Sequence, residues 1–401
     1  MKQPLLYLCH RIPYPPDKGD KIRSYHLLKY LCENYQVYLG AFIDDPRDWI
    51  HVPTVEALCA ETFFLPLKAS TAKLKSLTGL LNGQPLTLPY YKNRVMADWV
   101  SKIVSQEKIE RVIVYSSAMA QYVSENLPSQ SKKIIDFVDI DSDKWRQYSE
   151  NKRWPMNWIY RREAEKLFDY EKAISADFHA SLFVSETEAD LFRTMTPADG
   201  EKVSHYNNGV DTEYFSPSSQ FTNPYPSDRN ILVFTGAMDY WPNIDAVTWF
   251  SNNILPVIVK SQPKTWFYIV GSNPSEGVKK LSSLPNVHVT GRVDDIRPYL
   301  QFSKVVVAPM RVARGIQNKV LEAMAMEKIV VVTPQGYEGI NAIPGEEVLV
   351  ARSESDFSSY VLQAYDGRHQ EMGRAARKRV KADFSWEENL PVIGKWLEAG
   401  S

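Results

Sequence analysis

Continuous runs of apolar residues, each followed by a polar loop and a helical pattern, recur along the chain. Between residues 304 and 334, the run Val305–Met310 precedes a polar turn, apolar residues then fall at helical spacing, and a second run covers Ile329–Val332. Strands this continuously apolar are typical of parallel sheets buried on both faces. The same pattern predicts strands at Leu5–Cys9, Val37–Ile43, Arg111–Ser117, the start of Lys132–Trp145, Phe183–Val184, Val203–Asn207, Ile231–Phe234, Trp266–Val270 and Val287–Thr290.

Length and one polar segment predict two domains. A chain of 401 residues is too long for a single core. Residues 217–228 read PSSQFTNPYPSD, a composition typical of a linker. We therefore expect an N-terminal domain over residues 1–218, a linker over 219–227, a C-terminal domain over 228–386 and a terminal helix over 387–401.

Composition narrows the class of protein. The 47 basic and 48 acidic residues give a net charge of −1, which argues against broad nucleic-acid binding. The three cysteines, Cys9, Cys32 and Cys59, have no metal-ligand spacing and indicate reduced thiols. The first residues form a strand pattern rather than a signal peptide, and no window is apolar enough to span a bilayer. The sequence thus predicts a cytoplasmic protein.

The turn and helix between the last two runs form a candidate anion site. Arg311 and Gly315 lie in the turn, and Lys319 lies in the first turn of the helix. Unpaired peptide N–H groups and the helix dipole favour an anion at such a start, especially a phosphate. Glu322 projects from the same helix face as Lys319 and can accept hydrogen bonds from a pair of hydroxyls. The alternative is an ordinary surface turn before an ordinary helix.

These residues resemble a known motif. Arg311…Gly315…Lys319-x-x-Glu322-Ala-Met-Ala is similar to the donor-site motif of retaining glycosyltransferases of family 4, closest to transferases associated with bacterial exopolysaccharide clusters. The resemblance implies a GT-B fold, with two Rossmann-like domains facing across a cleft and the terminal helix crossing back to the first. It implies transfer of a hexose from a nucleotide-sugar, such as a UDP- or GDP-hexose, to a sugar or lipid-linked acceptor.

The resemblance also assigns roles within the donor site. Arg311 and Lys319 are expected to hold the diphosphate and to stabilise charge on the leaving group, and Glu322 to hold the ribose. A glutamate common in the family is replaced by Arg314, which can instead add positive charge. The loop after Gly236 lacks the basic residues that the family often has there. The expected donor-binding residues are Gly236, Gly271, Arg292, Val293, Arg314, Gly315, Lys319, Glu322 and Gly339.

Two loops of the first half are candidates for the acceptor side. Gly19, Asp20 and Arg23 follow the first strand, and Asp139 and Asp141 follow a later one. Loops at the carboxyl ends of strands are where α/β folds bind ligands. Asp20 as a helix cap and Arg23 as a solvated side chain are the alternatives for the first loop, and pairing with Lys144 and Arg146 is the alternative for the second. Asp139-x-Asp141-x-Asp143 lacks the glycine of a calcium loop, and a manganese motif does not accompany this fold, so we expect no metal and no cofactor.

Two further segments are candidates for contact with the inner membrane or a long acceptor. Residues 68–94 are basic and amphipathic, and residues 144–172 interleave tryptophans with Arg146, Lys152, Arg153, Arg161 and Arg162. A solvated helix and a helix packed across the domain face are the respective alternatives. For the whole chain, a sugar-nucleotide epimerase, a non-catalytic partner subunit and a sugar-phosphate binding protein stay open beside the transferase.

Overall fold

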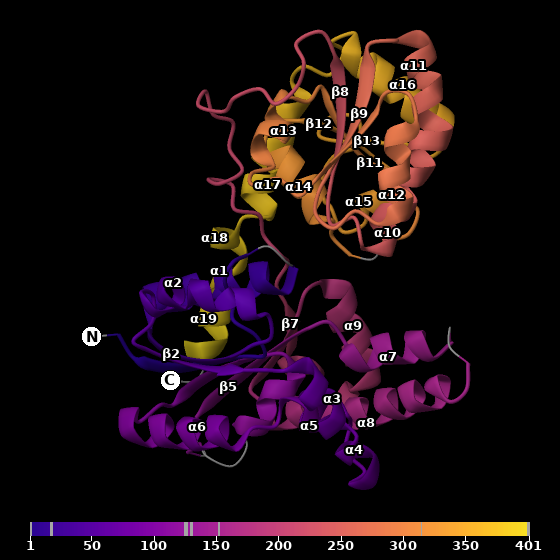
Figure 1. The fold of residues 1–401 in the computed structure, drawn as a ribbon. Helices are drawn as coiled ribbons and strands as arrows, with labels where there is room; N and C mark the ends of the chain where they lie inside the picture. Colours follow the sequence, from indigo (N-terminus) through magenta and orange to yellow (C-terminus); the bar gives the residue numbers. More distant parts are fainter. Residues whose placement is uncertain are drawn as a thin grey trace. The chain divides into compact units, whose positions relative to one another are not determined.

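The computed structural model describes residues 2–16, 19–123, 127–128, 131–150, 153–313 and 315–398. The chain divides into two compact units, one formed by Met1–Asn207 with Leu390–Ser401 and the other by Asn208–Asn389. Each unit has one parallel sheet with helices on both of its faces (Figure 1). Within the described ranges, no helix has both the length and the apolar character needed to cross a bilayer.

The sheet of the first unit has seven strands in the order β3-β2-β1-β4-β5-β6-β7, and all neighbours run parallel. Residues Leu5–Cys9 of β1 have no exposed surface, as expected for a strand covered on both faces. The strands are β1 (Pro4–Cys9), β2 (Gln36–Ile43), β3 (Glu61–Pro66), β4 (Arg111–Tyr115), β5 (Lys132–Val138), β6 (Ala180–Phe183) and β7 (Val203–His205). The helices are α1 (Gly19–Asn34), η1 (Pro46–His51), α2 (Val52–Glu56), α3 (Ala69–Ser76), α4 (Thr78–Leu81), α5 (Thr87–Tyr91), α6 (Arg94–Glu107), η2 (Ser117–Tyr122), α7 (Asp141–Glu150), α8 (Met156–Asp177), α9 (Glu186–Met195), η3 (Pro197–Lys202) and α19 (Pro391–Glu398).

The sheet of the second unit has six strands in the order β10-β9-β8-β11-β12-β13, again all parallel. The strands are β8 (Asn230–Thr235), β9 (Thr265–Val270), β10 (Val287–Gly291), β11 (Val305–Ala308), β12 (Ile329–Val332) and β13 (Leu349–Val350). The helices are α10 (Trp241–Trp249), η4 (Phe250–Ile254), α11 (Leu255–Ser261), α12 (Glu276–Lys280), η5 (Leu281–Ser283), α13 (Arg297–Phe302), α14 (Asn318–Ala325), α15 (Pro334–Tyr337), α16 (Glu354–Tyr365), α17 (Met372–Asp383) and α18 (Trp386–Asn389).

Two hydrophobic cores cover the two faces of this second sheet. Helices α13, α14 and α17 pack one core, and helices α10, α11, α12 and α16 pack the other (Figure 1). Successive residues of β11 and β12 alternate between these cores, which explains why both strands are apolar without interruption. The two parallel sheets confirm the predicted α/β fold class.

The boundary between the units falls at Asn207, before the predicted residue 218, because the next residues pack onto the second unit. Val210 donates its N–H to Phe384 O at 2.7 Å. The segment predicted as a linker is also docked there, since Tyr225 is buried and its hydroxyl donates to Tyr299 O at 2.7 Å. At the other end, the chain rejoins the first unit at Leu390.

Candidate functional site

In both units the strand order reverses beside the first strand, and this reversal positions the candidate sites. The second sheet runs β8-β9-β10 in one direction and β11-β12-β13 in the other. Loops leaving the carboxyl ends of two such strands separate and leave room for a ligand. The loop after β8 carries Gly236, and the loop after β11 leads into α14, which carries Lys319 and Glu322.

Lys319 projects from the first turn of α14 toward the loop that follows β8. Its Nζ donates to Asn243 Oδ1 at 2.9 Å and to Gln317 Oε1 at 3.4 Å, and lies 5.2 Å from the ring centre of Phe234. Both oxygen partners are neutral amides. Burial, opposed by the charge of Glu322, therefore lowers the pKa of Lys319 to about 8. Within the described ranges, this partly buried ammonium group has no carboxylate within hydrogen-bonding distance.

Glu322 lies one turn further along the same face of α14. Burial raises its pKa to about 7, and the nearby ammonium group of Lys319 only partly opposes this rise. Among the described residues, its carboxylate makes no hydrogen bond. A pair of ligand hydroxyls would supply the missing donors.

The loops after β8 and β9 pack too closely for any residue other than glycine. A Cβ on Gly271 would lie 1.6 Å from Gly236 O, and a Cβ on Gly236 would lie 2.8 Å from Asn243 Nδ2. Asn243 donates to Ala237 O at 2.9 Å while it accepts from Lys319, so it connects the β8 loop to α14. Sequence reasoning missed Asn243, whose only signal is its place in the first turn of the helix after a glycine loop.

Arg311 has a different partner and lies on a different side of α10. It forms an ion pair with Asp245, with Nε to Oδ2 at 3.0 Å, and its side chain is half exposed. Asp245 follows Asn243 by two positions, about 200° around a helix axis. The structure therefore does not bring Arg311 and Lys319 to one point. Arg311 instead lines a pocket of about 390 Å³ together with Trp249, Thr333, Gln335 and Arg352.

The remaining donor-side residues surround these loops. Gly315 and Gly339 have φ angles of 69° and 77°, which favour glycine. A Cβ on Gly339 would lie 2.8 Å from Ile316 Cγ1, so this loop packs against the approach to α14. Val293 packs against the core and Arg292 is exposed. Arg314 lies outside the described residues.

In the first unit the structure places Arg23 in the core, which differs from both expectations for this residue. Its side chain is fully buried, and Nε donates to Asp136 Oδ2 at 2.9 Å. The guanidinium also lies 3.4 Å from the ring centre of Tyr206. Arg23 thus connects α1 to β5 and neither reaches an acceptor nor faces solvent. Sequence reasoning could not find this pairing because the two charges are separated by more than a hundred residues.

Asp20, at the start of α1, belongs to a charged cluster at the reversal point of the first sheet. Arg11 Nη1 donates to Asp20 Oδ2 at 2.8 Å, and His10 Nε2 lies 3.5 Å from the same oxygen. These interactions outweigh burial and hold the pKa of Asp20 well below its usual range. His10 stacks on Tyr115 at the end of β4, with ring centres 5.8 Å apart. Gly19 begins α1 with open space around its Cα.

Asp139 and Asp141 are both neutralised within the chain. Lys144 Nζ lies 2.8 Å from Asp139 Oδ2 and 3.2 Å from Asp141 Oδ1. Asp143 pairs with Arg146 instead. Across the described parts of the chain, no group of three or more His, Cys, Asp or Glu side chains could hold a metal ion.

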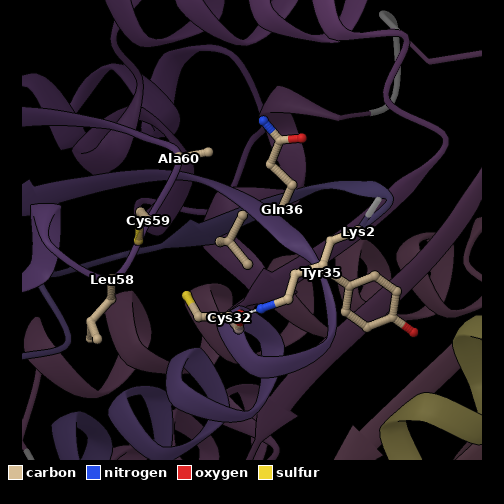
Figure 2. Close-up of a pocket in the computed structure, with 8 residues that line it drawn as sticks. Lys2, Cys32, Tyr35, Gln36, Leu58, Cys59 and Ala60 are labelled. Carbon is tan, nitrogen blue, oxygen red and sulfur yellow. Dashed lines mark hydrogen bonds between the residues drawn. The ribbon is translucent and has the colours of Figure 1, made fainter.

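A pocket of about 420 Å³ opens in the first unit between α1 and the approach to β3 (Figure 2). Cys32, Cys59 and Lys2 line it, and Lys2 Nζ donates to Cys32 O at 2.6 Å. A hydrogen bond from Cys59 lowers the pKa of Cys32, against the effect of burial. The described lining residues include none of those predicted for the donor or the acceptor.

Residues 229–366 match the model of the family described as "Glycosyl transferases group 1". Over 367 residues the chain is 23% identical to an "Uncharacterized 44.6 kDa protein in cps region" of Klebsiella pneumoniae, covering 87% of this chain and 88% of the relative.

Solved structures extend the likeness to the whole fold. Sucrose-phosphate synthase of Thermosynechococcus elongatus superposes with a TM-score of 0.68, 17% identity and 98% coverage of both chains. HepE of Anabaena, solved with UDP-glucose, gives a TM-score of 0.62, 14% identity and 99% coverage of both chains. These matches confirm the resemblance stated from residues 311–325: residues 229–366 are similar to glycosyl transferases of group 1, and the chain has the GT-B fold.

Proposed function

We propose that this protein is a retaining glycosyltransferase that moves a hexose from a nucleotide-diphosphate sugar to a hydroxyl of a sugar or lipid-linked acceptor. The observation that carries the proposal is the pair Lys319 and Glu322 on α14. Each side chain is partly buried, and among the described residues neither has a hydrogen bond to a group of opposite charge. A partly buried charge in this condition is costly unless a ligand completes it.

A nucleotide-sugar has the groups that this pair lacks. Its diphosphate would accept a hydrogen bond from Lys319 Nζ and from N–H groups at the start of α14. Two ribose hydroxyls would donate to the carboxylate of Glu322. Anabaena HepE was solved with UDP and UDP-glucose, which supports a nucleotide-sugar as the class of donor.

In the transfer, the bond between the anomeric carbon and the diphosphate oxygen breaks, and a bond from the acceptor oxygen to that carbon forms. The acceptor proton leaves with the diphosphate. Negative charge collects on the leaving oxygen, so Lys319 contributes most in the transition state. The acceptor would be held by the first unit, where Asp20, Asp139 and Asp141 follow strands of the sheet. We propose that the reaction needs no metal, because these carboxylates already have cationic partners.

The setting we propose is bacterial exopolysaccharide synthesis in the cytoplasm. The relative in the Klebsiella cps region supports this role. The cytoplasmic location is supported by the apolar segments of the described chain, which form strands rather than membrane-spanning helices.

The decisive experiment has two steps. A thermal-shift panel of UDP- and GDP-hexoses identifies the donor, since a ligand that binds only the folded state raises the melting temperature. Turnover of that donor is then measured with and without acceptor extracts, and with EDTA. We expect acceptor-dependent transfer that EDTA does not reduce.

The outcomes separate the other functions. Conversion of the nucleotide-sugar into an isomer without acceptor would indicate an epimerase. Binding without any turnover would indicate a non-catalytic partner subunit. Loss of transfer in EDTA with recovery in manganese or magnesium would contradict the metal-free mechanism.

A further inference from the structure

The two segments with an unusual basic and aromatic composition lie next to each other in the first unit. Arg162 of α8 donates from Nη2 to Gly79 O of α4 at 2.8 Å and from Nη1 to Gln84 O at 3.1 Å. The buried carboxylate of Glu163 accepts from Leu86 N at 2.5 Å and from Thr87 N at 3.0 Å. Figure 1 shows α3, α4 and α5 beside α8. Segments about 80 residues apart therefore form one surface.

This surface exposes large apolar side chains from both segments. On α3 and α4, Leu74, Leu77 and Leu81 are 72%, 51% and 87% exposed. Their spacing of three and four residues places them on one helical face. At the start of α8, Trp154 and Trp158 are 81% and 57% exposed. Trp158 lies one turn before Arg162, on the side of α8 that meets α4. Several large exposed apolar side chains on neighbouring helices indicate a binding surface.

Basic residues outnumber acidic ones around these apolar residues, although the exposed Glu165 lies one turn after Arg161 and Arg94 pairs with Asp98. Residues 68–94 contain Lys68, Lys73, Lys75, Lys92 and Arg94 and no acidic residue. Residues 153–162 contain Arg153, Arg161 and Arg162 and again no acidic residue. The whole chain has a net charge of −1, so this local excess is not a property of the average surface. The partner should therefore be negatively charged and should accept apolar groups.

We infer that this basic apolar surface, formed by α3, α4 and the start of α8, binds the surface of an anionic phospholipid bilayer. Leucine and tryptophan would enter the boundary between headgroups and acyl chains, and lysine and arginine would meet the lipid phosphates. A second copy of the chain is a poor occupant, because it would bring like charges together. The inference does not depend on the donor chemistry, since none of these residues lies in the nucleotide-binding unit.

Vesicle co-sedimentation of the full chain tests this inference. The probes are vesicles of phosphatidylglycerol with phosphatidylethanolamine, and vesicles of phosphatidylcholine alone. We expect binding to the first kind only, weakened by added salt because Debye screening reduces charge attraction.

Two double variants separate the contributions. Lys73→Glu with Arg161→Glu reverses one charge in each segment. Loss of a basic side chain costs about fivefold in affinity, so the two losses predict a decrease of at least ~25-fold. Leu77→Ser with Leu81→Ser should also weaken binding, although it leaves the charge unchanged. All four side chains are exposed, so circular dichroism should show unchanged folding. The matched control, Lys29→Glu with Lys260→Glu, makes the same charge change at exposed positions elsewhere and should bind like the wild type.

Three results would overturn the inference. The first is that the wild type does not bind phosphatidylglycerol vesicles, and the second is that all variants bind them equally. The third is that light scattering shows an oligomer, which the leucine variant no longer forms, while the protein does not bind vesicles. The last would assign the surface to protein association. The melting temperature of the same samples is also measured with nucleotide-sugar. A shift without vesicle binding would contradict the membrane inference alone, and vesicle binding without a shift would contradict the donor site alone.

Discussion

At the scale of the residue, burial changes the pKa values of two charged neighbours on one helix face, Lys319 and Glu322. Neighbours on one helix face with opposite charges are usually solvated and contribute a few tenths of a kcal/mol. Here burial moves the pKa of Lys319 down to about 8 and that of Glu322 up to about 7. Near neutral pH, Lys319 therefore stays mostly protonated and Glu322 is partly protonated.

The first prediction compares three alanine substitutions. Lys319→Ala should lower kcat more than it raises the donor KM, because charge on the leaving oxygen appears in the transition state. Glu322→Ala should mainly raise the donor KM, because its hydroxyl contacts exist before the reaction. Each substitution should cost about 1.5–3 kcal/mol in donor binding, the range for hydrogen bonds to charged groups, and Lys319→Ala should cost more than this in the transition state.

Arg311→Ala is the comparison variant for this experiment. Asp245 already neutralises Arg311 on the other side of α10, so its removal should cost less than the removal of Lys319. Steady-state kinetics with the identified donor measure all three. A folded Lys319→Ala, Glu322→Ala double variant with wild-type affinity and turnover would show that the pair is an ordinary surface pair.

The second prediction is a bell-shaped dependence of donor affinity on pH. As the pH rises through about 8, Lys319 loses its proton and its attraction for the diphosphate. As the pH falls through about 7, Glu322 gains a proton and accepts fewer hydroxyl hydrogen bonds. Affinity should therefore be greatest between these values, as calorimetry from about pH 6 to about pH 9 can measure.

Two conservative variants assign the limbs of this profile. Lys319→Arg should remove the alkaline limb, because arginine stays charged throughout the range. Glu322→Gln should remove the acid limb. A profile that is flat in the wild type, or unchanged in both variants, would exclude these two groups as its source.

Some residues of the site could be predicted from sequence and others could not, for physical reasons. Lys319 and Glu322 follow from spacing within one helix, which sequence records directly. Asn243 and His10 act through partners that only the fold brings close. Arg23 was expected at an open edge, but a carboxylate on a distant strand draws it into the core.

At the scale of the element, uninterrupted apolar runs predicted the strands well because both faces of each sheet are covered. The run at Val305–Met310 is longer than the strand, which ends at Ala308, since the core continues past the last paired residue. Helices α3, α4 and α5 were less predictable, because their packing depends on the buried Glu163 of α8 rather than on their own pattern.

The third prediction concerns Arg377 of α17, which fixes the segment that enters the second unit. Its guanidinium donates to Phe215 O at 2.8 Å, Thr212 O at 2.9 Å and Ser216 Oγ at 3.1 Å, and also to Ala325 O. Arg377→Ala leaves several carbonyl groups without these donors and should destabilise the segment by about 2–4 kcal/mol. Hydrogen exchange should quicken over residues 210–216.

Arg374 is the matched control for this variant. It lies on the same helix but is exposed and, among the residues that the structure describes, pairs with Glu371 alone, so Arg374→Ala should leave exchange unchanged. Equal exchange over residues 210–216 in the Arg377 and Arg374 variants would mean that these hydrogen bonds do not hold the segment.

At the scale of the whole molecule, the path of the chain between the units is the feature that sequence located least well. The polar stretch 217–228 has a linker composition, yet Tyr225 within it is buried against the second unit. A linker is recognised by a low content of apolar residues averaged over a segment. Such an average does not reveal that one tyrosine of the segment is buried at a specific position. The first unit, in turn, is completed only by residues from the end of the chain.

The last prediction tests that completion. In α19, Ile393 and Leu397 are fully buried, and Glu398 accepts from Tyr35 Oη at 2.9 Å. Ile393→Ala and Leu397→Ala should each destabilise the first unit by about 2–5 kcal/mol, the usual cost of such cavities. Hydrogen exchange should therefore quicken in α1, β4 and β5, while the nucleotide-sugar binding that we propose for the second unit stays at the wild-type level. Lys395→Ala, at an exposed position of the same helix, is the control. If Ile393→Ala and Leu397→Ala instead left exchange in the first unit at the level of the control, α19 would be an appendage rather than a part of that unit's core.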